Sequence, residues 1–299
     1  TKIVTLVEGD YLFAVTHGEY GGGSGIDARV KSPLMSAEAV IKPSDAAQAG
    51  FWTTQWVALI DRSGTDVVVT GDSAIELPQN VASATLGALS MGADTRLAVG
   101  PASGFAGNLT FTGATSLGGG TATIAPQNQQ TIQLSNISES TASNLAIEGS
   151  GTVVLLTANT YSGTTTVGGG TVLEVRANGA LGDTGAGTIV QDGGSLQLRE
   201  PVTYSSAEPL TLSGNGNAIA AGALGSGGGN SSFSGPITLG GDATIRNDNG
   251  TLYLYGGVNT AGNQVTFSTD GGNIEVQTGG FSGAGAVRKE GNNDLIINA

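Results

Sequence analysis

The residues in this sequence that can perform acid–base or metal chemistry are few. His17 is the only histidine among 299 residues, and there is no cysteine. A serine–histidine–aspartate triad would have to use His17 as its general base. A zinc or transition-metal site would lack its usual nitrogen and sulfur ligands. We therefore predict no catalytic residues, no metal site and no cofactor, and we interpret His17 as a solvated or packed side chain.

Pairs of carboxylates are the stronger candidates for catalysis. Stacked parallel β-strands can bring two carboxylates from adjacent turns close enough to cleave a polysaccharide. The candidate residues are Asp242, Asp248, Asp270, Glu275 and Asp294. Most of them stand beside glycine or asparagine, where aspartate is common for backbone reasons alone. We therefore expect the chain not to be an enzyme, and polysaccharide degradation is kept as an alternative.

Two glycine-rich stretches resemble ligand-binding loops. Gly22–Asp27 matches the start of the calcium-binding G-G-x-G-x-D repeat, but the motif occurs once and Arg29 stands where an apolar residue is needed. A single copy cannot build the shared calcium site of such repeats. Gly227–Gly229 lacks the Lys-Ser/Thr pair of a phosphate-binding loop. We interpret both stretches as loops.

Three tyrosines are candidates for a binding surface. Tyr253 and Tyr255 alternate with Leu252 and Leu254, so the two rings lie on the polar face of a predicted strand. Together with Tyr161 they can form an outward aromatic strip, and aromatic rings bind the flat apolar faces of sugars. The alternative is cross-strand packing on the protein surface.

The charge of the chain excludes several partners. The net charge is −13 and the isoelectric point is near 4.2. Nucleic-acid binding needs a basic surface, and an anionic membrane repels an acidic one. No apolar run reaches the ~18 residues of a membrane-spanning helix. Residues 1–20 lack the pattern of a signal peptide, so we expect that a secretion signal has been removed or lies upstream.

The amino-acid composition of the sequence changes near residue 80. Residues 1–80 hold 9 of the 51 glycines and both tryptophans. We interpret residues 1–80 as a β-rich N-terminal cap or small module. Its predicted strands are Lys2–Val7, Tyr11–Thr16, Gln55–Ile60 and Asp66–Thr70, with short helical turns over Ser36–Ile41 and Ser44–Ala49.

Residues 81–299 contain short predicted strands at regular intervals, separated by Gly, Asn, Asp and Ser. The predicted strands are 121–124, 131–134, 144–147, 152–156, 164–167, 171–175, 188–190, 195–198, 210–212, 217–220, 237–239, 243–246, 251–255, 264–267, 273–276, 286–289 and 295–298. The corners are predicted at Gly168–Gly170, Asn178-Gly179, Gly193-Gly194, Gly240-Gly241, Asn249-Gly250 and Gly271-Gly272, because glycine and asparagine tolerate positive φ.

The side-chain pattern decides among the all-β architectures. Each strand offers a narrow aliphatic face, as in Leu196/Leu198 and Leu210/Leu212, with Thr, Gln or Ser outward. A sandwich core usually contains more aromatic residues, and there is no tryptophan after residue 80. We therefore predict a parallel β-solenoid over residues 81–299, with about 20–25 residues per turn and roughly 9–11 turns.

One element resembles a known family. Asn159-Thr160-Tyr161-Ser162-Gly163, within the stretch 152–180, is similar to the autotransporter-associated β-strand repeat, and the resemblance covers about residues 145–299. It implies a right-handed parallel β-helix (solenoid) that is secreted or exposed on a bacterial surface and often adhesive. It carries over no catalytic residues. No outer-membrane barrel follows, so we expect a fragment of a longer passenger or a processed subunit.

These observations predict an extracellular structural or adhesive protein that acts as a rigid rod. Its expected partners are a surface polysaccharide or a host or matrix ligand, with no nucleic acid and no membrane insertion. A second hypothesis is a self-assembling subunit of an extracellular filament or sheath, joined through strand edges at Thr1–Val7 and Leu295–Ala299. The third is the polysaccharide-degrading enzyme.

Overall fold

The chain divides into two compact units, Thr1–Thr54 and Gln55–Ala299. The structure is a computed structural model, and it describes residues 28–30, 39–41, 58–77, 81–101 and 107–298. These residues contain no helix, and therefore none that is long and apolar enough to cross a membrane. The all-β class predicted from the sequence is confirmed.

The described part of the first unit is one antiparallel strand pair. β1 (Ala28–Val30) lies beside β2 (Ala39–Ile41). The helical turn predicted over Ser36–Ile41 is wrong at Ala39–Ile41, which form a strand, and β-branched residue types such as Val40 and Ile41 favour strands in general. The predictions for Lys2–Val7, Tyr11–Thr16 and Ser44–Ala49 lie outside the described residues.

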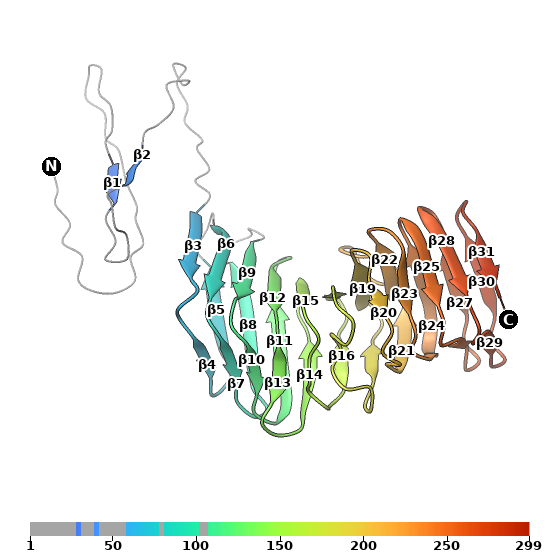
Figure 1. The fold of residues 1–299 in the computed structure, drawn as a ribbon, viewed down its shortest axis with the longest axis horizontal. Helices are drawn as coiled ribbons and strands as arrows, with labels where there is room; N and C mark the ends of the chain where they lie inside the picture. The colour runs from blue at the N-terminus through green and yellow to red at the C-terminus, as the bar shows by residue number, and fades with distance from the viewer. Residues whose placement is uncertain (1–27, 31–38, 42–57, 78–80, 102–106, 299) are drawn as a thin grey trace, which may run out of the picture. The chain divides into compact units, whose positions relative to one another are not determined.

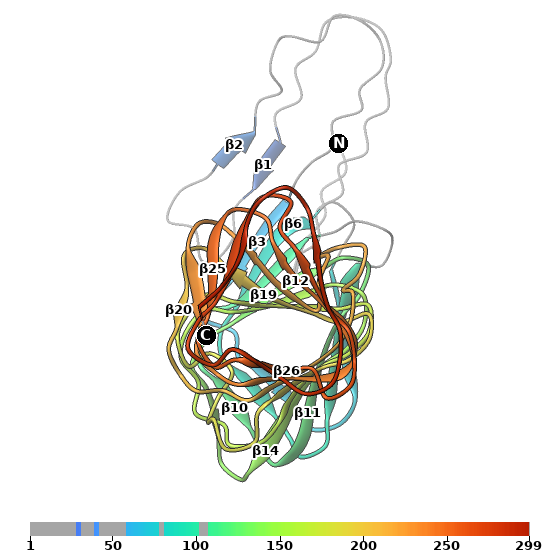
Figure 2. The same ribbon diagram turned by 90° about the vertical axis from the view of Figure 1, so that its right-hand side faces the viewer.

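The second unit is a parallel β-solenoid of about ten turns. Its turns stack in sequence order from β3 to β31, and the view along the stack shows them as closed loops (Figures 1 and 2). The strands lie on three faces, which we call A, C and B in the order the chain visits them, and most turns contribute a strand to each face. Because neighbouring strands on a face come from successive turns, all pairings among the described strands of this unit are parallel, and one isolated antiparallel bridge joins Gly216 and Ala221.

Face A holds β3 (Ala58–Arg62), β6 (Val81–Leu86), β9 (Asn108–Phe111), β12 (Thr131–Leu134), β15 (Thr152–Leu155), β17 (Val172–Val175), β19 (Ser195–Arg199), β22 (Leu224–Gly227), the second half of β24 (Ile237–Asn247), β27 (Val265–Ser268) and β30 (Val287–Glu290). Face B holds β5 (Ser73–Leu77), β8 (Arg96–Pro101), β11 (Gly120–Pro126), β14 (Ser143–Ile147), β16 (Thr165–Val167), β18 (Thr188–Val190), β21 (Leu210–Gly214), the first half of β24, β26 (Val258–Asn259) and β29 (Phe281–Ser282). Face C holds β4 (Val67–Val69), β7 (Leu89–Met91), β10 (Thr115–Leu117), β13 (Ile137–Glu139), β20 (Thr203–Tyr204), β23 (Ser231–Phe233), β25 (Gly250–Leu254), β28 (Gly272–Val276) and β31 (Leu295–Ile297).

The core is a continuous column of aliphatic side chains, stacked like on like. The strand register aligns fully buried residues of successive turns; on face A they are Ile132, Val153, Leu173, Leu196 and Leu224. Burial of each such side chain contributes about 1.5–3 kcal/mol. The parallel solenoid predicted from the alternation of aliphatic and polar residues is therefore confirmed.

Most turns have the predicted length, and a few are longer. Thr152 pairs with Val172, 20 residues on, whereas Leu196 pairs with Leu224, 28 residues on. The extra residues of the long turn include 217–220, which are not a strand as predicted. The Asn217 side chain accepts hydrogen bonds from two nearby backbone N–H groups and donates to carbonyls of two earlier turns. This local side-chain bonding competes with strand pairing.

The solenoid begins before residue 81. β3 pairs in parallel with β6, and β4 with β7, so the strands predicted over Gln55–Ile60 and Asp66–Thr70 overlap the first described turn. The rise in glycine near residue 81 therefore marks a change in corner composition and not the start of the fold. The cap or module predicted over residues 1–80 is therefore wrong for Ala58–Leu77, which belong to the solenoid, and stays a prediction for the residues before them.

The glycine corners are partly as predicted. Gly250 has φ of +70°, as expected for Asn249-Gly250. Gly240-Gly241 lies where the chain passes from face B to face A, as predicted, but both residues stay within β24 and form no separate turn. Gly256 is needed for close approach, since an added Cβ would overlap the carbonyl oxygen of Gly235 on the preceding turn.

Candidate functional site

A shallow groove on face C brings together side chains of three successive turns. Its volume is about 280 Å³, and its lining residues are Thr203, Asn230, Ser231, Ser232, Ser234, Tyr253 and Tyr255. The register of β20, β23 and β25 places Thr203 beside Ser232, and Ser232 beside Tyr253. The groove exists because the small Thr and Ser side chains of two turns leave room next to the large rings of the third.

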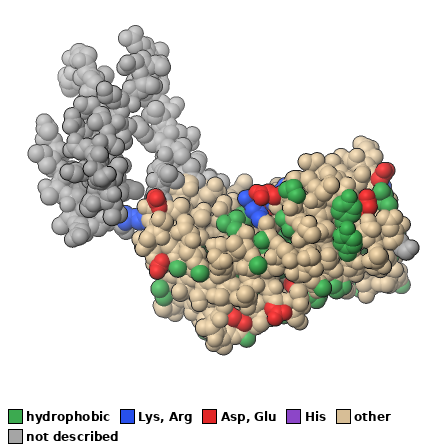
Figure 3. All heavy atoms as spheres, in the orientation of Figure 1, with side chains coloured by type: hydrophobic (Ala, Val, Ile, Leu, Met, Phe, Trp, Pro, Cys, Tyr) green, Lys and Arg blue, Asp and Glu red, His purple; other side chains and the backbone are tan. Residues whose placement is uncertain are grey.

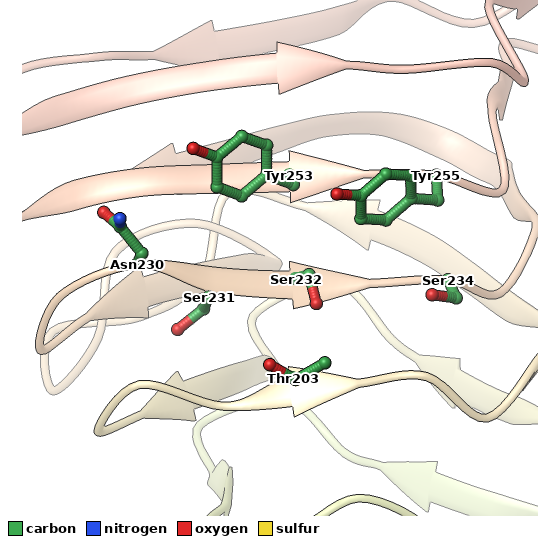
Figure 4. A pocket seen from close by; sticks show the side chains of 7 residues that line it. All are labelled: Thr203, Asn230, Ser231, Ser232, Ser234, Tyr253 and Tyr255. Carbon is green, nitrogen blue, oxygen red and sulfur yellow. The ribbon is translucent and has the colours of Figure 1, made fainter.

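The two tyrosine rings form a nearly flat platform. Their centroids are 6.3 Å apart and their planes differ by 18°. Figure 4 shows the rings side by side along β25 with their faces turned to the viewer and both hydroxyls pointing the same way. Tyr255 is 43% exposed, which is unusual for a ring of this size on an otherwise polar face. A hydrophobic patch is visible over the same region of the solenoid in Figure 3.

The inward side chains of the same strands hold the platform in place. Leu252 and Leu254 alternate with the tyrosines and are fully buried. On the two preceding turns, Tyr204 and Phe233 stack inside the core with centroids 5.4 Å apart. Packing on the inner side of the sheet therefore fixes the backbone from which the groove side chains project.

The groove is uncharged and rich in free hydroxyls. Within the described residues, the hydroxyls of Thr203, Ser232, Ser234, Tyr253 and Tyr255 make no hydrogen bond to protein. Ser232 is only 7% exposed, so its hydroxyl lies at the bottom of the groove. The lining contains no Lys, Arg, Asp or Glu. These hydroxyls are free to exchange their water partners for a ligand.

One carboxylate lies at the rim of the groove. β25 pairs with β28 so that Glu275 stands beside Tyr253 on the following turn. Its Oε2 accepts a hydrogen bond of 2.9 Å from Gln277 Nε2. The rim is therefore acidic on the side of β28 and neutral on the side of β23.

Tyr161 does not belong to this platform. The sequence-based prediction of an outward Tyr161 is wrong, because the side chain is fully buried and its hydroxyl shares a 2.6 Å hydrogen bond with Thr165 Oγ1. Burial raises the pKa of the Tyr161 phenol above its ordinary value. Tyr161 is thus a core residue that contributes no binding surface.

The Asn-Thr-Tyr-Ser-Gly element replaces a missing strand on face C. Between β13 and β20 the described chain has no face C strand, and Asn159 connects the turns instead. Its Oδ1 accepts the N–H of Ile137 at 2.7 Å, and its Nδ2 donates to the carbonyl of Ala180. One buried asparagine therefore satisfies backbone groups on the turns before and after it, which is a structural role.

The candidate carboxylates are mostly occupied by structural contacts. Asp248 and Asp270, from adjacent turns, both pair with Arg246. Asp242 Oδ1 accepts the backbone N–H of Gln264 on the next turn at 2.8 Å. Asp294 lies directly before β31, and its backbone N–H donates to the side chain of Asn273. Of the five candidates, only Asp248 and Asp270 are brought close together, because both form ion pairs with Arg246.

The same use of acidic side chains recurs along the solenoid. Asp66, Asp72 and Asp94 each accept a backbone N–H from the next turn, at 2.7, 3.0 and 2.9 Å. A carboxylate that accepts a backbone N–H forms a charge-assisted hydrogen bond. Part of the acidity of the chain therefore comes from residues that connect successive turns at the corners.

Glu208 is a buried acid that the sequence analysis missed. Its side chain is fully buried, Oε1 accepts a 2.8 Å hydrogen bond from Thr188 Oγ1, and Oε2 has no partner. Burial raises the pKa of Glu208 to about 7, with a smaller contribution from the charge of Asp183. The sequence around it, Ala207-Glu208-Pro209, gives no signal that distinguishes it from a solvated loop residue.

No group of three or more His, Cys, Asp or Glu side chains is placed to hold a metal ion in the part of the chain that the structure describes. His17 and the Gly22–Asp27 stretch lie outside that part. Gly227 ends β22, and the next two glycines lie in the connection to β23.

The fold and the groove define a parallel β-solenoid that carries an aromatic, hydroxyl-lined surface site. Comparison of the chain with protein-family models, with curated proteins and with solved structures gives no match.

Proposed function

We propose that the chain is an extracellular structural and adhesive protein of a bacterial surface, in which a stiff solenoid presents a contact surface. The observation that carries this proposal is the unbroken stack of about ten turns over a single aliphatic core. A column of this kind is extended and resists bending because each turn bonds to both neighbours. Its length separates the surface that anchors it from the surface it touches.

Two further features support this role. The absence of cysteine suits a chain that is exported and lives in an oxidising environment. The resemblance of Asn159–Gly163 to autotransporter-associated repeats points to the same location. Three of the five carboxylates that the alternative enzyme would draw on instead pair with Arg246 or cap a backbone group at a corner.

The test is adhesion of the full chain under flow. Beads coated with the protein should be retained on surfaces of insoluble polysaccharide or extracellular-matrix protein. Leu196→Asp places a carboxylate in the core column and should abolish retention, whereas Gln191→Asp adds the same charge at an exposed position and should preserve it. Equal retention of all three proteins, or of none, would contradict an adhesive role that depends on the folded rod.

Two measurements on the same sample separate the alternatives. Electron microscopy over a range of concentrations should show single short rods, and rods that lengthen with concentration would favour the filament subunit. Incubation with neutral and acidic polysaccharides should release no reducing or unsaturated ends, and their release would favour the enzyme.

A further inference from the structure

We propose that the groove formed by Thr203, Ser232, Ser234, Tyr253 and Tyr255 binds a neutral glycan chain that lies along β25. This inference rests on the proposed adhesive function and names the ligand class that its contact surface takes.

The platform selects for a ligand with a flat apolar face. Two rings side by side, 6.3 Å between centroids and 18° from parallel, offer one extended surface in place of two separate contacts. The C–H face of a pyranose packs on such a surface, and consecutive sugars of an extended chain can cover both rings. The rings follow the strand direction, so a glycan chain that covers both runs along β25 (Figure 4).

The side chains at the bottom of the groove favour a ligand that also carries hydroxyls. Thr203, Ser232 and Ser234 present hydroxyls that make no hydrogen bond to the described part of the protein, on the side of the rings facing β23. Hydroxyls both donate and accept, which matches the equatorial hydroxyls at the edge of a sugar ring. A purely apolar ligand would leave the almost buried Ser232 hydroxyl without a partner, which costs free energy.

Charge excludes an acidic ligand. The lining has no cationic side chain to pair with a carboxylate or sulfate. Glu275 stands next to Tyr253 at the rim, and the whole chain carries a net charge of −13. An anionic polysaccharide would therefore meet repulsion without any compensating ion pair. The volume of about 280 Å³ is at the lower limit for small-molecule sites, so we expect weak binding that gains strength from many rods on one surface.

The test compares glycan probes against a matched pair of variants. Cellohexaose and laminarihexaose serve as neutral probes and oligogalacturonate as the acidic one, with binding followed by saturation-transfer NMR on the full chain. The test variant is Tyr253→Ser with Tyr255→Ser, which copies Ser232 and Ser234 from the preceding turn and therefore suits the same strand positions. The control is Ile219→Ser, which removes an exposed apolar side chain (39% exposed) outside the groove.

We expect at least one neutral probe to bind, the double variant to bind it at least about ten-fold more weakly, and the control to bind as the wild type does. Tyr253→Phe with Tyr255→Phe should retain most of the binding, because the rings carry the contact. Melting curves of the variants verify that each is folded. The inference is overturned if no neutral probe binds, if only oligogalacturonate binds, or if the folded double variant binds as tightly as the wild type.

The adhesion assay separates failure of this inference from failure of the proposed function. If the double variant binds no glycan but its beads are still retained, the groove binds glycans without being the adhesive contact. If the wild-type beads are retained while no glycan binds, the rod adheres through another surface, for example to a protein, and the glycan inference is wrong. If wild-type beads are not retained at all, the adhesive proposal itself is wrong.

Discussion

Replacement of Glu208 by Gln is expected to stabilise the solenoid at neutral pH and to leave its stability unchanged in acid. Glu208 is fully buried, and only one of its carboxylate oxygens has a hydrogen-bond donor, from Thr188. A buried carboxylate with one donor is poorly solvated when charged, so the folded protein favours the protonated form. Gln keeps the size and the acceptor oxygen of that form and cannot ionise.

The size of the effect follows from the two pKa values. The pKa of Glu208 is about 7 in the fold, against an ordinary value of 4.5. A difference of this size corresponds to about 3 kcal/mol of unfolding free energy. Below pH ~4.5 the acid is protonated in both the folded and the unfolded state, and the fold loses no stability through Glu208. Between about pH 4.5 and 7 the unfolded chain ionises first, so the folded state loses stability, and the full loss is present above pH 7.

Urea denaturation followed by circular dichroism from pH 4 to pH 8 measures this directly. The difference between Glu208→Gln and wild type should rise from near zero at pH 4 to about 3 kcal/mol at pH 8. Glu148→Gln, at an exposed carboxylate, is the control and should change stability by less than about 1 kcal/mol at every pH. A difference that does not depend on pH, or a Gln variant less stable than wild type at pH 8, would refute the proposed burial of an ionisable acid.

Three other substitutions test how successive turns are joined. Asn159→Ala leaves two buried backbone groups without partners and should cost about 2–4 kcal/mol in urea denaturation; a loss below about 1 kcal/mol would mean that the asparagine does not connect the turns. Gly256→Ala should lower the melting temperature by several degrees, because the new methyl overlaps the Gly235 carbonyl; an unchanged melting temperature would contradict the close stacking of these corners. Asp94→Ala removes the acceptor for the N–H of Thr121 and should speed amide hydrogen exchange there, whereas Asp94→Asn should keep it slow; equal exchange in both would contradict corner capping.

The strands of faces A and B could be predicted because their pattern is strong. Thr131–Leu134 was predicted with the same bounds as β12, and 237–239 and 243–246 both lie in β24. Aliphatic residues at i and i+2 mark one buried face, and the glycines beside them mark the ends. On face C the predicted strands 251–255, 273–276 and 295–298 overlap β25, β28 and β31, whereas β20 and β23 were missed, since they are two and three residues long and β23 begins with two serines.

The parts that could not be predicted depend on neighbours far along the chain. Tyr161 lies in a segment without strand geometry, so the alternation of apolar and polar residues does not indicate whether its side chain points inward. The burial of Glu208 depends on Thr188 from the preceding turn. The groove was anticipated only in part, because Tyr253 and Tyr255 were identified while the serines and threonine beside them come from turns 21 to 50 residues earlier.

The measurement that tests the parallel stack most directly is a series of distances between pairs of spin labels placed an increasing number of turns apart. The chain has no cysteine, so variants with two introduced cysteines on the outward side of face B can be labelled at those two positions alone. Thr123 is aligned through the strand register with Thr211, Thr238 and Asn259, which lie four, five and six turns further along.

Double electron–electron resonance on the pairs of Thr123 with each of these positions should give distances that rise in equal steps of about 4.8 Å, from roughly 19 to 29 Å between backbones. Distances that stay constant, fall, or rise in unequal steps would show that the strands pair in another order and would contradict the solenoid.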